Sequence, residues 1–255
     1  MSHISYSALK DWAFCAFYHK LTRVDKVDAF KGNEYTAFGS AIHSVCEKKL
    51  LQESMDDNFF INEFEKNLSE IEDFELSENK TLEMIEQGER IIPHIEDSLS
   101  DYFDEYEVLA VEMPLYEPIE GHDKYMFKGF IDAVVCTPDG TVHIFDWKTC
   151  SWGWDSRKKS DKMVTYQLTL YKHFFAQKMK IDPKDIQTHF ALLKRTANKN
   201  HVEFFRVTSG AKKTENALKL LDTALYNIKN QRYIKNRLSC TSGYGCPFYK
   251  TEHCP

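Results

Sequence analysis

The hydrophobic positions divide the chain into helical and strand-like segments. Apolar residues recur three or four positions apart in some segments, and they alternate with polar residues or form short runs in others. Helices are predicted over 5–19, 37–53, 58–72, 78–103, 161–180 and 211–236. Strands are predicted over 107–117, 124–137, 141–149, 186–195 and 201–208. This order predicts an α/β fold in which helices flank a central mixed β-sheet.

The length of the chain predicts a single domain. A chain of 255 residues, of which 42% are hydrophobic, can bury one large core, so residues 1–255 are expected to form one domain. Residues 53–105 are rich in Glu and Asp and are expected to form a helical insertion that faces water. Pro93 lies inside the helix predicted over 78–103, where a proline kinks or splits a helix.

A predicted hairpin carries the most informative residues. A Pro-Asp-Gly turn at residues 138–140 joins two apolar strands, which makes these strands neighbours. Asp132 lies six residues before the proline of this turn, and Asp146 lies six residues after its glycine. The equal spacing predicts that the two carboxylates lie opposite each other across the hairpin.

Asp146 begins an Asp-Trp-Lys triplet. Side chains alternate along a strand, so Asp146 and Lys148 share one face while Trp147 points to the other. The carboxylates of Asp132 and Asp146 and the backbone carbonyl of Trp147 are suitable ligands for Mg²⁺ or Mn²⁺. Lys148 would assist the attacking water or stabilise developing negative charge. The cluster therefore predicts metal-assisted hydrolysis of a phosphodiester, although such triplets also occur by chance at strand ends.

Two helical motifs flank the hairpin. Upstream, Gly39 precedes His43 and Glu47, which share a helical face because they are four residues apart. Downstream, Gln167 and Tyr171 have the same spacing. Each pair also fits an ordinary amphipathic helix, with a solvated glutamate in the first case and a half-buried tyrosine in the second.

With these motifs, the chain resembles the RecB-like branch of the PD-(D/E)XK nucleases, which includes CRISPR-associated and phage exonucleases. The resemblance runs from about Tyr6 to Cys254. It implies a restriction-endonuclease-like core with an N-terminal helical insertion. It also implies that Gln167 and Tyr171 steady the catalytic lysine or the DNA backbone.

The resemblance assigns roles to residues by their positions in these motifs. The implied catalytic residues are Asp132, Asp146, Lys148, Gln167 and Tyr171. The implied ligands of Mg²⁺ or Mn²⁺ are His43, Asp132, Asp146 and the backbone carbonyl of Trp147. Glu47 and Glu112 are additional candidates, and Glu112 matches a further acidic position of the family.

The cysteines fall into two groups. The seven cysteines are Cys15, Cys46, Cys136, Cys150, Cys240, Cys246 and Cys254. The odd number argues against a disulfide scaffold, and three of them lie in apolar or strand-like segments that predict small buried residues. The other four are one early cysteine and three in a tail over 238–255, which is expected to pack with the N-terminal helix.

The resemblance implies that these four cysteines hold a [4Fe–4S] cluster. The ligands would be Cys15, Cys240, Cys246 and Cys254, since four thiolates are the usual set for such a cluster. The spacing of the three tail cysteines is wider than in the family form. A zinc site made of four cysteines, or of three with His253, and free thiols in a folded tail remain alternatives.

The charge of the chain is unevenly distributed. Its 33 basic and 39 acidic residues give a net charge of −6, and much of the acid lies in the predicted insertion. Aromatic and basic residues together follow the predicted hairpin, as suits single-stranded DNA, although an ordinary surface loop has the same composition. The candidate DNA-binding residues are Trp152, Trp154, Arg157, Lys158 and Lys159.

The absence of a leader segment and of any run of about eighteen apolar residues predicts a cytoplasmic protein with no membrane contact. The unpaired cysteines agree with a reducing compartment.

The leading functional hypothesis is a metal-dependent DNA exonuclease that acts at single-stranded ends in recombination, repair or phage DNA processing. An endonuclease, or a nuclease that trims DNA for CRISPR adaptation, is the first alternative. A non-catalytic DNA-binding scaffold subunit is the second.

Overall fold

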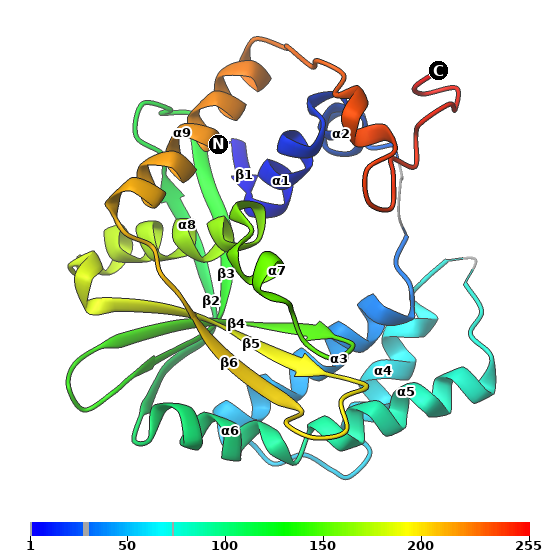
Figure 1. The fold of residues 1–255 in the computed structure, drawn as a ribbon, viewed down its shortest axis with the longest axis vertical. Helices are drawn as coiled ribbons and strands as arrows, with labels where there is room; N and C mark the ends of the chain where they lie inside the picture. Colours follow the sequence, from blue (N-terminus) through cyan, green and yellow to red (C-terminus); the bar gives the residue numbers. More distant parts are fainter. Residues whose placement is uncertain (1, 28–30, 73) are drawn as a thin grey trace. The chain divides into compact units, whose positions relative to one another are not determined.

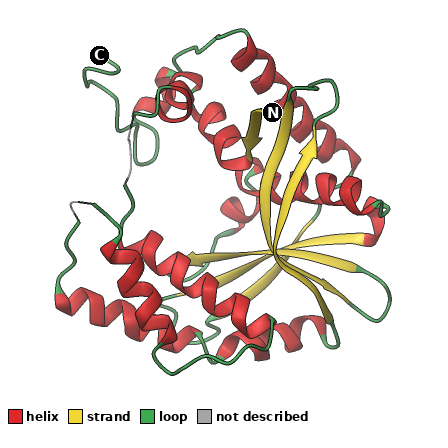
Figure 2. Ribbon diagram, turned by 180° about the vertical axis from the view of Figure 1, so that it is seen from behind, coloured by secondary structure: helices red, strands yellow, loops and turns green. Residues whose placement is uncertain are grey.

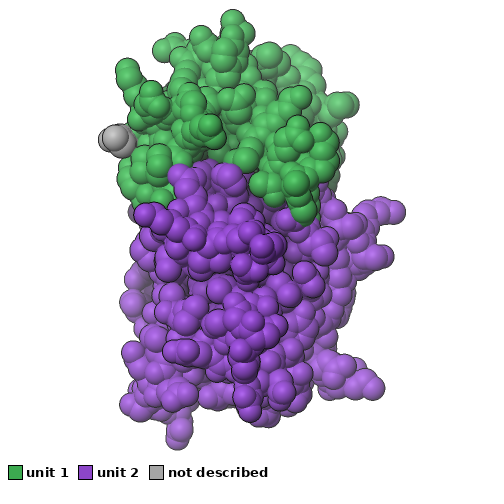
Figure 3. All heavy atoms as spheres, turned by 90° about the vertical axis from the view of Figure 1, so that its left-hand side faces the viewer, with its two compact units in different colours: residues 1–30, 115–129, 210–255 green, residues 31–114, 130–209 purple. Residues whose placement is uncertain are grey.

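The chain folds into two compact units. The computed structural model describes residues 2–27, 31–72 and 74–255, so residue 73 of the predicted insertion lies outside the described residues. Unit 1 contains residues 1–30, 115–129 and 210–255, and unit 2 contains residues 31–114 and 130–209 (Figure 3). In the described part of the chain, no helix is long and apolar enough to cross a membrane. The single domain predicted from the length remains a prediction.

A mixed β-sheet forms the centre of unit 2, as predicted (Figure 2). Its strand β4 runs antiparallel to β3 and parallel to β5, and β6 runs antiparallel to β5. Strand β2 pairs with β3, and both of these strands continue into unit 1. The strands are β2 (Glu107–Pro118), β3 (Tyr125–Cys136), β4 (Val142–Cys150), β5 (Ile186–Lys194) and β6 (Val202–Val207).

Helices cover both faces of this sheet in unit 2 (Figure 1). Helices α3 to α6 cover one face, and α8 covers the other. The helices are α3 (Glu34–Leu50), α4 (Phe59–Ser69), α5 (Glu78–Ile91), α6 (His94–Phe103), α7 (Ser156–Ser160) and α8 (Lys162–Met179). A 3₁₀ turn, η2 (Pro183–Asp185), precedes β5.

The apolar core lies between the sheet and helices α3 to α6. Phe38, Phe60 and Phe64 from these helices pack edge-on or stacked against one another. On the sheet side, Phe145 and Trp147 belong to the same buried cluster. They are two residues apart on β4, so alternation places both on the core face of the strand.

Unit 1 gathers the two ends of the chain. A short strand, β1 (Ser2–Ser5), runs parallel to β3 with Ser2 opposite Tyr125. Its last residue caps the first helix, because the Ser5 hydroxyl accepts a hydrogen bond from the Ala8 N–H at 3.2 Å. The helices are α1 (Tyr6–Phe14), α2 (Ala16–His19), the π-helix η1 (Lys20–Val24), α9 (Ala211–Lys229) and the 3₁₀ turn η3 (Arg237–Cys240).

Most predicted elements are confirmed, with differences at their ends. The helix predicted over 78–103 is interrupted at Pro93, between α5 and α6, as predicted. The helix predicted over 5–19 is interrupted at Cys15, which has extended backbone angles. The helix predicted over 211–236 ends at Lys229, because Gln231 adopts a left-handed conformation with φ of 53°. Strand β1 and helix α7 were not predicted, since each has too few residues to show a period.

Two buried histidines form a polar chain inside unit 2. His143 on β4 and His189 on β5 lie with Nδ1 and Nε2 3.0 Å apart. The Tyr102 hydroxyl lies 3.1 Å from the other nitrogen of His189, and Thr137 lies 3.1 Å from the other nitrogen of His143. Burial, reinforced by His143 and Arg206, lowers the pKa of His189 from 6.5 to about 3. The pair is therefore neutral in the folded chain at physiological pH.

This histidine predicts a stability that falls in mild acid. In the unfolded chain, His189 binds a proton with a pKa of 6.5, whereas in the folded chain it binds one only near pH 3. The folded state therefore loses stability as the pH falls through this window. His189 should account for about 2 kcal/mol of lost unfolding free energy between pH 7 and pH 5. Urea unfolding measures the unfolding free energy at each pH. Between pH 7 and pH 5, His189→Gln should lose about that much less unfolding free energy than wild type. An equal loss in both proteins would contradict this account.

Candidate active site

The hairpin of β3 and β4 brings the two predicted acids together. Ala133 lies opposite Phe145 in this antiparallel pair, so the next step of the register places Asp132 opposite Asp146. The backbone N–H of Trp147 donates a hydrogen bond of 2.7 Å to the Oδ2 atom of Asp132. The predicted alignment across the hairpin is therefore confirmed.

Three side chains from three elements converge at this point. His43 on α3, Glu112 on β2 and Asp132 on β3 each offer a ligand atom, and these atoms lie within 4.8 Å of one another. His43 Nδ1 lies 3.7 Å from Asp132 Oδ2. One imidazole and two carboxylates suit Mn²⁺ well and Mg²⁺ acceptably. Among the residues described, this is the only such group of three.

Glu112 reaches the group through an unusual backbone conformation. Its φ angle is 47°, within a strand whose other residues are extended. A glutamate in the left-handed region costs free energy, and such conformations concentrate at functional sites. Pro114, two residues later, is a sequence signal for an irregular strand. From the sequence, Glu112 was only an additional candidate, whereas the structure makes it one of the three central ligand candidates.

The electrostatics of the site favour a bound cation. Burial raises the pKa of Asp132 well above its usual value, and the neighbouring Asp146 carboxylate raises it further. Burial also raises the pKa of Glu112, with contributions from Glu47 and Asp146. Burial lowers the pKa of His43, which keeps its imidazole neutral and able to bind a metal. The residues present therefore fit a divalent cation, which would relieve the repulsion among these acids.

Asp146 connects the acids to the predicted lysine and glutamine. Lys148 Nζ forms an ion pair with Asp146 Oδ2, and Gln167 Nε2 donates to Asp146 Oδ1 at 2.6 Å. Burial works against the charge of Lys148, but Asp146 and Asp132 raise its pKa above the usual value. Gln167 also lies 3.5 Å from the hydroxyl of Tyr171, whose pKa is raised by burial. Gln167 thus contacts the lysine's partner rather than the lysine itself.

Two further predicted residues lie at the edge of the group. Glu47 is near enough to Glu112 to affect its pKa but is outside the set of three ligand atoms. The backbone of Trp147 forms a hydrogen bond with His43 that favours the charged imidazole. The Trp147 carbonyl therefore remains a candidate ligand beside His43.

The predicted DNA-binding segment begins where β4 ends. Trp152 is 77% exposed, and Lys158 Nζ lies 4.6 Å from the centre of the Trp154 ring. Lys159 is paired with Glu203, so part of its charge is used within the protein. Arg157 lies exposed on α7. One exposed ring and several cations thus follow directly after the strand that carries Lys148, whereas the Trp154 ring packs against Phe190 and Phe205.

The four cysteines of the predicted cluster line one cavity in unit 1. The backbone N–H of Asn236 lies 3.3 Å from Cys15 Sγ, and the N–H of Cys246 donates to the Cys240 carbonyl at 3.0 Å. Burial raises the pKa of Cys246, and the three other cysteines raise it further. In the described residues, these sulfur atoms do not form a group within 4.8 Å of one another. The arrangement is therefore wider than a single-ion site.

Comparisons with known proteins identify the family and the fold of this chain. The model of the PD-(D/E)XK nuclease superfamily matches residues 3–254. A protein from Eubacterium rectale, provisionally named an exonuclease, has a similar fold with a TM-score of 0.62 at 19% identity, covering 94% of this chain and 86% of its own. LHK-Exo, crystallised with dAMP, gives a TM-score of 0.30 at 10% identity, covering 77% of this chain and 93% of its own. No curated protein gives a significant sequence match.

The family match spans almost the whole chain, and its fold is the mixed sheet with flanking helices seen here. The superfamily resemblance drawn from the Asp-Trp-Lys hairpin is confirmed. The chain belongs to the PD-(D/E)XK nuclease superfamily.

Proposed function

We propose that this nuclease is a metal-dependent DNA exonuclease that acts at single-stranded ends. One observation carries the proposal. His43, Glu112 and Asp132 converge within 4.8 Å beside the Asp146–Lys148 ion pair. Imidazole, carboxylates and an ammonium group are the components that metal-assisted phosphodiester hydrolysis requires.

His43, Glu112, Asp132 and Asp146 would hold Mg²⁺ or Mn²⁺. A bound ion of this kind would polarise the phosphate and lower the pKa of a coordinated water. The protein residues supply the orientation. Trp147 fixes the Asp132 carboxylate through its N–H, and Gln167 fixes Asp146 through its amide. Fixed carboxylates reduce the reorganisation needed when negative charge develops.

Lys148 would act on the substrate side of Asp146. Its raised pKa keeps the ammonium group charged at neutral pH. Because its side chain is 33% exposed while that of Asp146 is only 2% exposed, the ammonium group is the part of the pair that a phosphate can reach. Lys148 would therefore donate a hydrogen bond to a phosphate oxygen as the negative charge on that oxygen increases.

The preference for single strands rests on the segment after β4. Bases of an unpaired strand can stack on exposed rings such as Trp152, and cations such as Lys158 pair with phosphates. The name of the Eubacterium rectale protein is consistent with exonuclease activity, which we extend to this chain as part of the proposal.

Replacing Asp146 should abolish cleavage. Asp146→Ala removes a proposed ligand and leaves Lys148 without its partner, so cleavage should fall by at least about 10²-fold. Cleavage by the isosteric variant Asp146→Asn should fall equally, which separates lost chemistry from lost packing. The assay is release of label from 5′- and 3′-labelled single- and double-stranded DNA with Mg²⁺ or Mn²⁺. Asp185→Ala, an exposed acid before β5, is the matched control.

The same assay distinguishes the alternatives. Wild-type activity in the Asp146 variants would refute this site. Circular single-stranded DNA should remain intact, because an exonuclease needs an end, and its cleavage would support an endonuclease instead. A wild-type protein that cleaves no DNA with either metal would favour the non-catalytic scaffold.

A second proposal concerns the four cysteines of unit 1. We propose that Cys15, Cys240, Cys246 and Cys254 hold a [4Fe–4S] cluster with a structural role. Their convergence on one cavity supports it. A four-iron cluster is larger than one ion, so its thiolates lie further apart than those of a zinc site.

Metal analysis of protein purified without oxygen tests the cluster. We expect about four iron atoms per chain, with absorbance near 400 nm that marks thiolate-bound iron. Cys246→Ser should lose most of this iron. Cys136→Ser, on β3 and not among the residues that line the cavity, should retain it. One equivalent of zinc without iron would support the zinc alternative, and neither metal would support free thiols.

A further inference from the structure

Arg195 lies at the end of the sheet that also carries the proposed active site. It follows β5 directly. Its backbone N–H donates a hydrogen bond of 2.9 Å to the carbonyl of Cys150, at the end of β4. Lys148 pairs in register with Leu192, so Arg195 lies three residues beyond the position of Lys148. That separation is about 10 Å along the strand.

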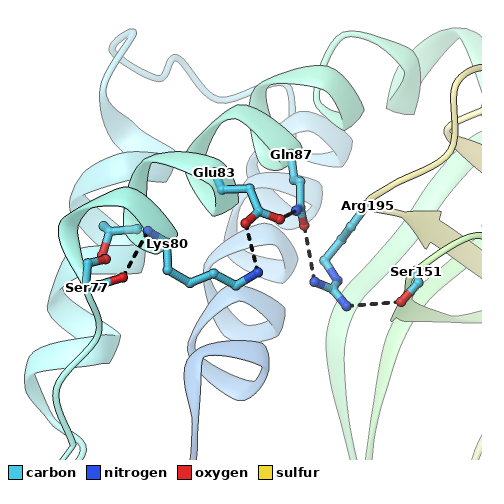
Figure 4. A network of polar contacts seen from close by, with 7 residues as sticks. Ser77, Lys80, Glu83, Gln87, Ser151 and Arg195 are labelled. Carbon is cyan, nitrogen blue, oxygen red and sulfur yellow. Dashed lines mark hydrogen bonds and ion pairs between the residues drawn. The ribbon is translucent and has the colours of Figure 1, made fainter.

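The guanidinium group is held by neighbours from two helices and from the residue that follows β4. Its Cζ atom lies 4.5 Å from the centre of the Tyr35 ring at the start of α3. One terminal nitrogen donates to Gln87 on α5 at 3.2 Å, and the other lies 3.5 Å from the Ser151 hydroxyl (Figure 4). Arginine has five N–H donors, and these two contacts leave others available for an external acceptor.

Arg195 has no acidic partner in the described part of the chain. Within the described residues, no carboxylate forms an ion pair with it, and its side-chain acceptors are the neutral Gln87 and Ser151. The nearest acid in this network is Glu83, which accepts from Gln87 at 2.9 Å and pairs with Lys80 at 3.0 Å (Figure 4). The charge of Glu83 is thus offset by a lysine, and the guanidinium charge remains available to an anion.

Gln87 fixes the position of the guanidinium. Its side chain is buried, with a residue exposure of 2%, and both ends of its amide are occupied, one by Glu83 and the other by Arg195. A buried and fully bonded amide cannot rotate freely. The guanidinium is therefore held in advance, as is expected of a group that binds a planar or tetrahedral anion with several oxygens.

Two elements lead from the metal-ligand group to Arg195. Helix α3 carries His43 and, eight residues earlier, Tyr35, which is about 12 Å along the helix. Strand β4 carries Lys148 and then leads to Ser151. An anion on Arg195 would thus lie beyond the bond being cut but within reach of the same DNA strand. Tyr35 is 43% exposed, so its ring could also contact a base.

We propose that Arg195 binds a phosphate of the substrate strand outside the scissile phosphate, with Tyr35 and Gln87 positioning the guanidinium. This inference rests on the proposed function, because it requires DNA as the substrate. Arg195 is then a substrate-positioning residue. It would add affinity without sequence preference, since phosphates carry no base information.

The test is the salt dependence of DNA binding without divalent metal. Binding of a short single-stranded DNA is measured by fluorescence anisotropy at several salt concentrations for wild type, Arg195→Gln and Arg206→Gln. Arg206 is an exposed arginine on β6, opposite His189 in the register, and serves as the matched control. Losing one phosphate contact should weaken binding about ten-fold and reduce the slope of log K against log salt by about one. The control should match wild type.

A purely structural role for Arg195 predicts a different result. In that case Arg195→Gln would have a lower melting temperature than wild type, an unchanged salt slope and the DNA affinity of the control. This result would overturn the inference but not the nuclease proposal. If Arg195→Gln does not fold, Arg195→Lys decides. It keeps the charge and loses the planar fork, so the slope should be retained and affinity should fall several-fold. Unchanged affinity of Arg195→Lys would overturn the inference. A wild type that binds no DNA would overturn both this inference and the nuclease proposal.

Discussion

The hydrogen bond from the Trp147 N–H to the Asp132 carboxylate connects the core of unit 2 to its candidate active site. The Trp147 ring is 2% exposed and packs edge-on against Phe145 and Phe204. The same residue therefore anchors the strand in the core and orients an acid on the opposite side of the backbone. Because neighbouring residues on a strand point in opposite directions, core packing sets the position of Asp146 and Lys148 as well.

The site concentrates unfavourable features that the surrounding fold has to support. Burial opposes the charge of Asp132, and Glu112, which is exposed, adopts a costly backbone conformation. Lys148 offsets part of this charge through Asp146. Such features are found where a protein positions groups for chemistry, and a divalent cation would compensate the remaining negative charge. The sheet and α3 hold these groups in place.

The sequence predicted the fold and the hairpin well, because both follow from short-range patterns. The Pro-Asp-Gly turn fixes the register, and the register fixes Asp132 opposite Asp146. The weight of Glu112 could not be predicted, since it depends on one positive φ angle in β2. The contact of Gln167 with Asp146, and the stacking of Arg195 on Tyr35, depend on how helices pack against strands distant in sequence. Periodicity carries no information on such contacts.

The convergence of His43, Glu112 and Asp132 assigns them to one site for a divalent cation. The most direct test is Mn²⁺ binding without DNA, followed by the electron paramagnetic resonance signal of free Mn²⁺. Glu107→Gln, an exposed acid on the same strand as Glu112, serves as the control. Wild type and this control should bind Mn²⁺ equally well, while Glu112→Gln should bind it at least about ten-fold more weakly. Equal Mn²⁺ affinity in all three proteins would contradict the claim.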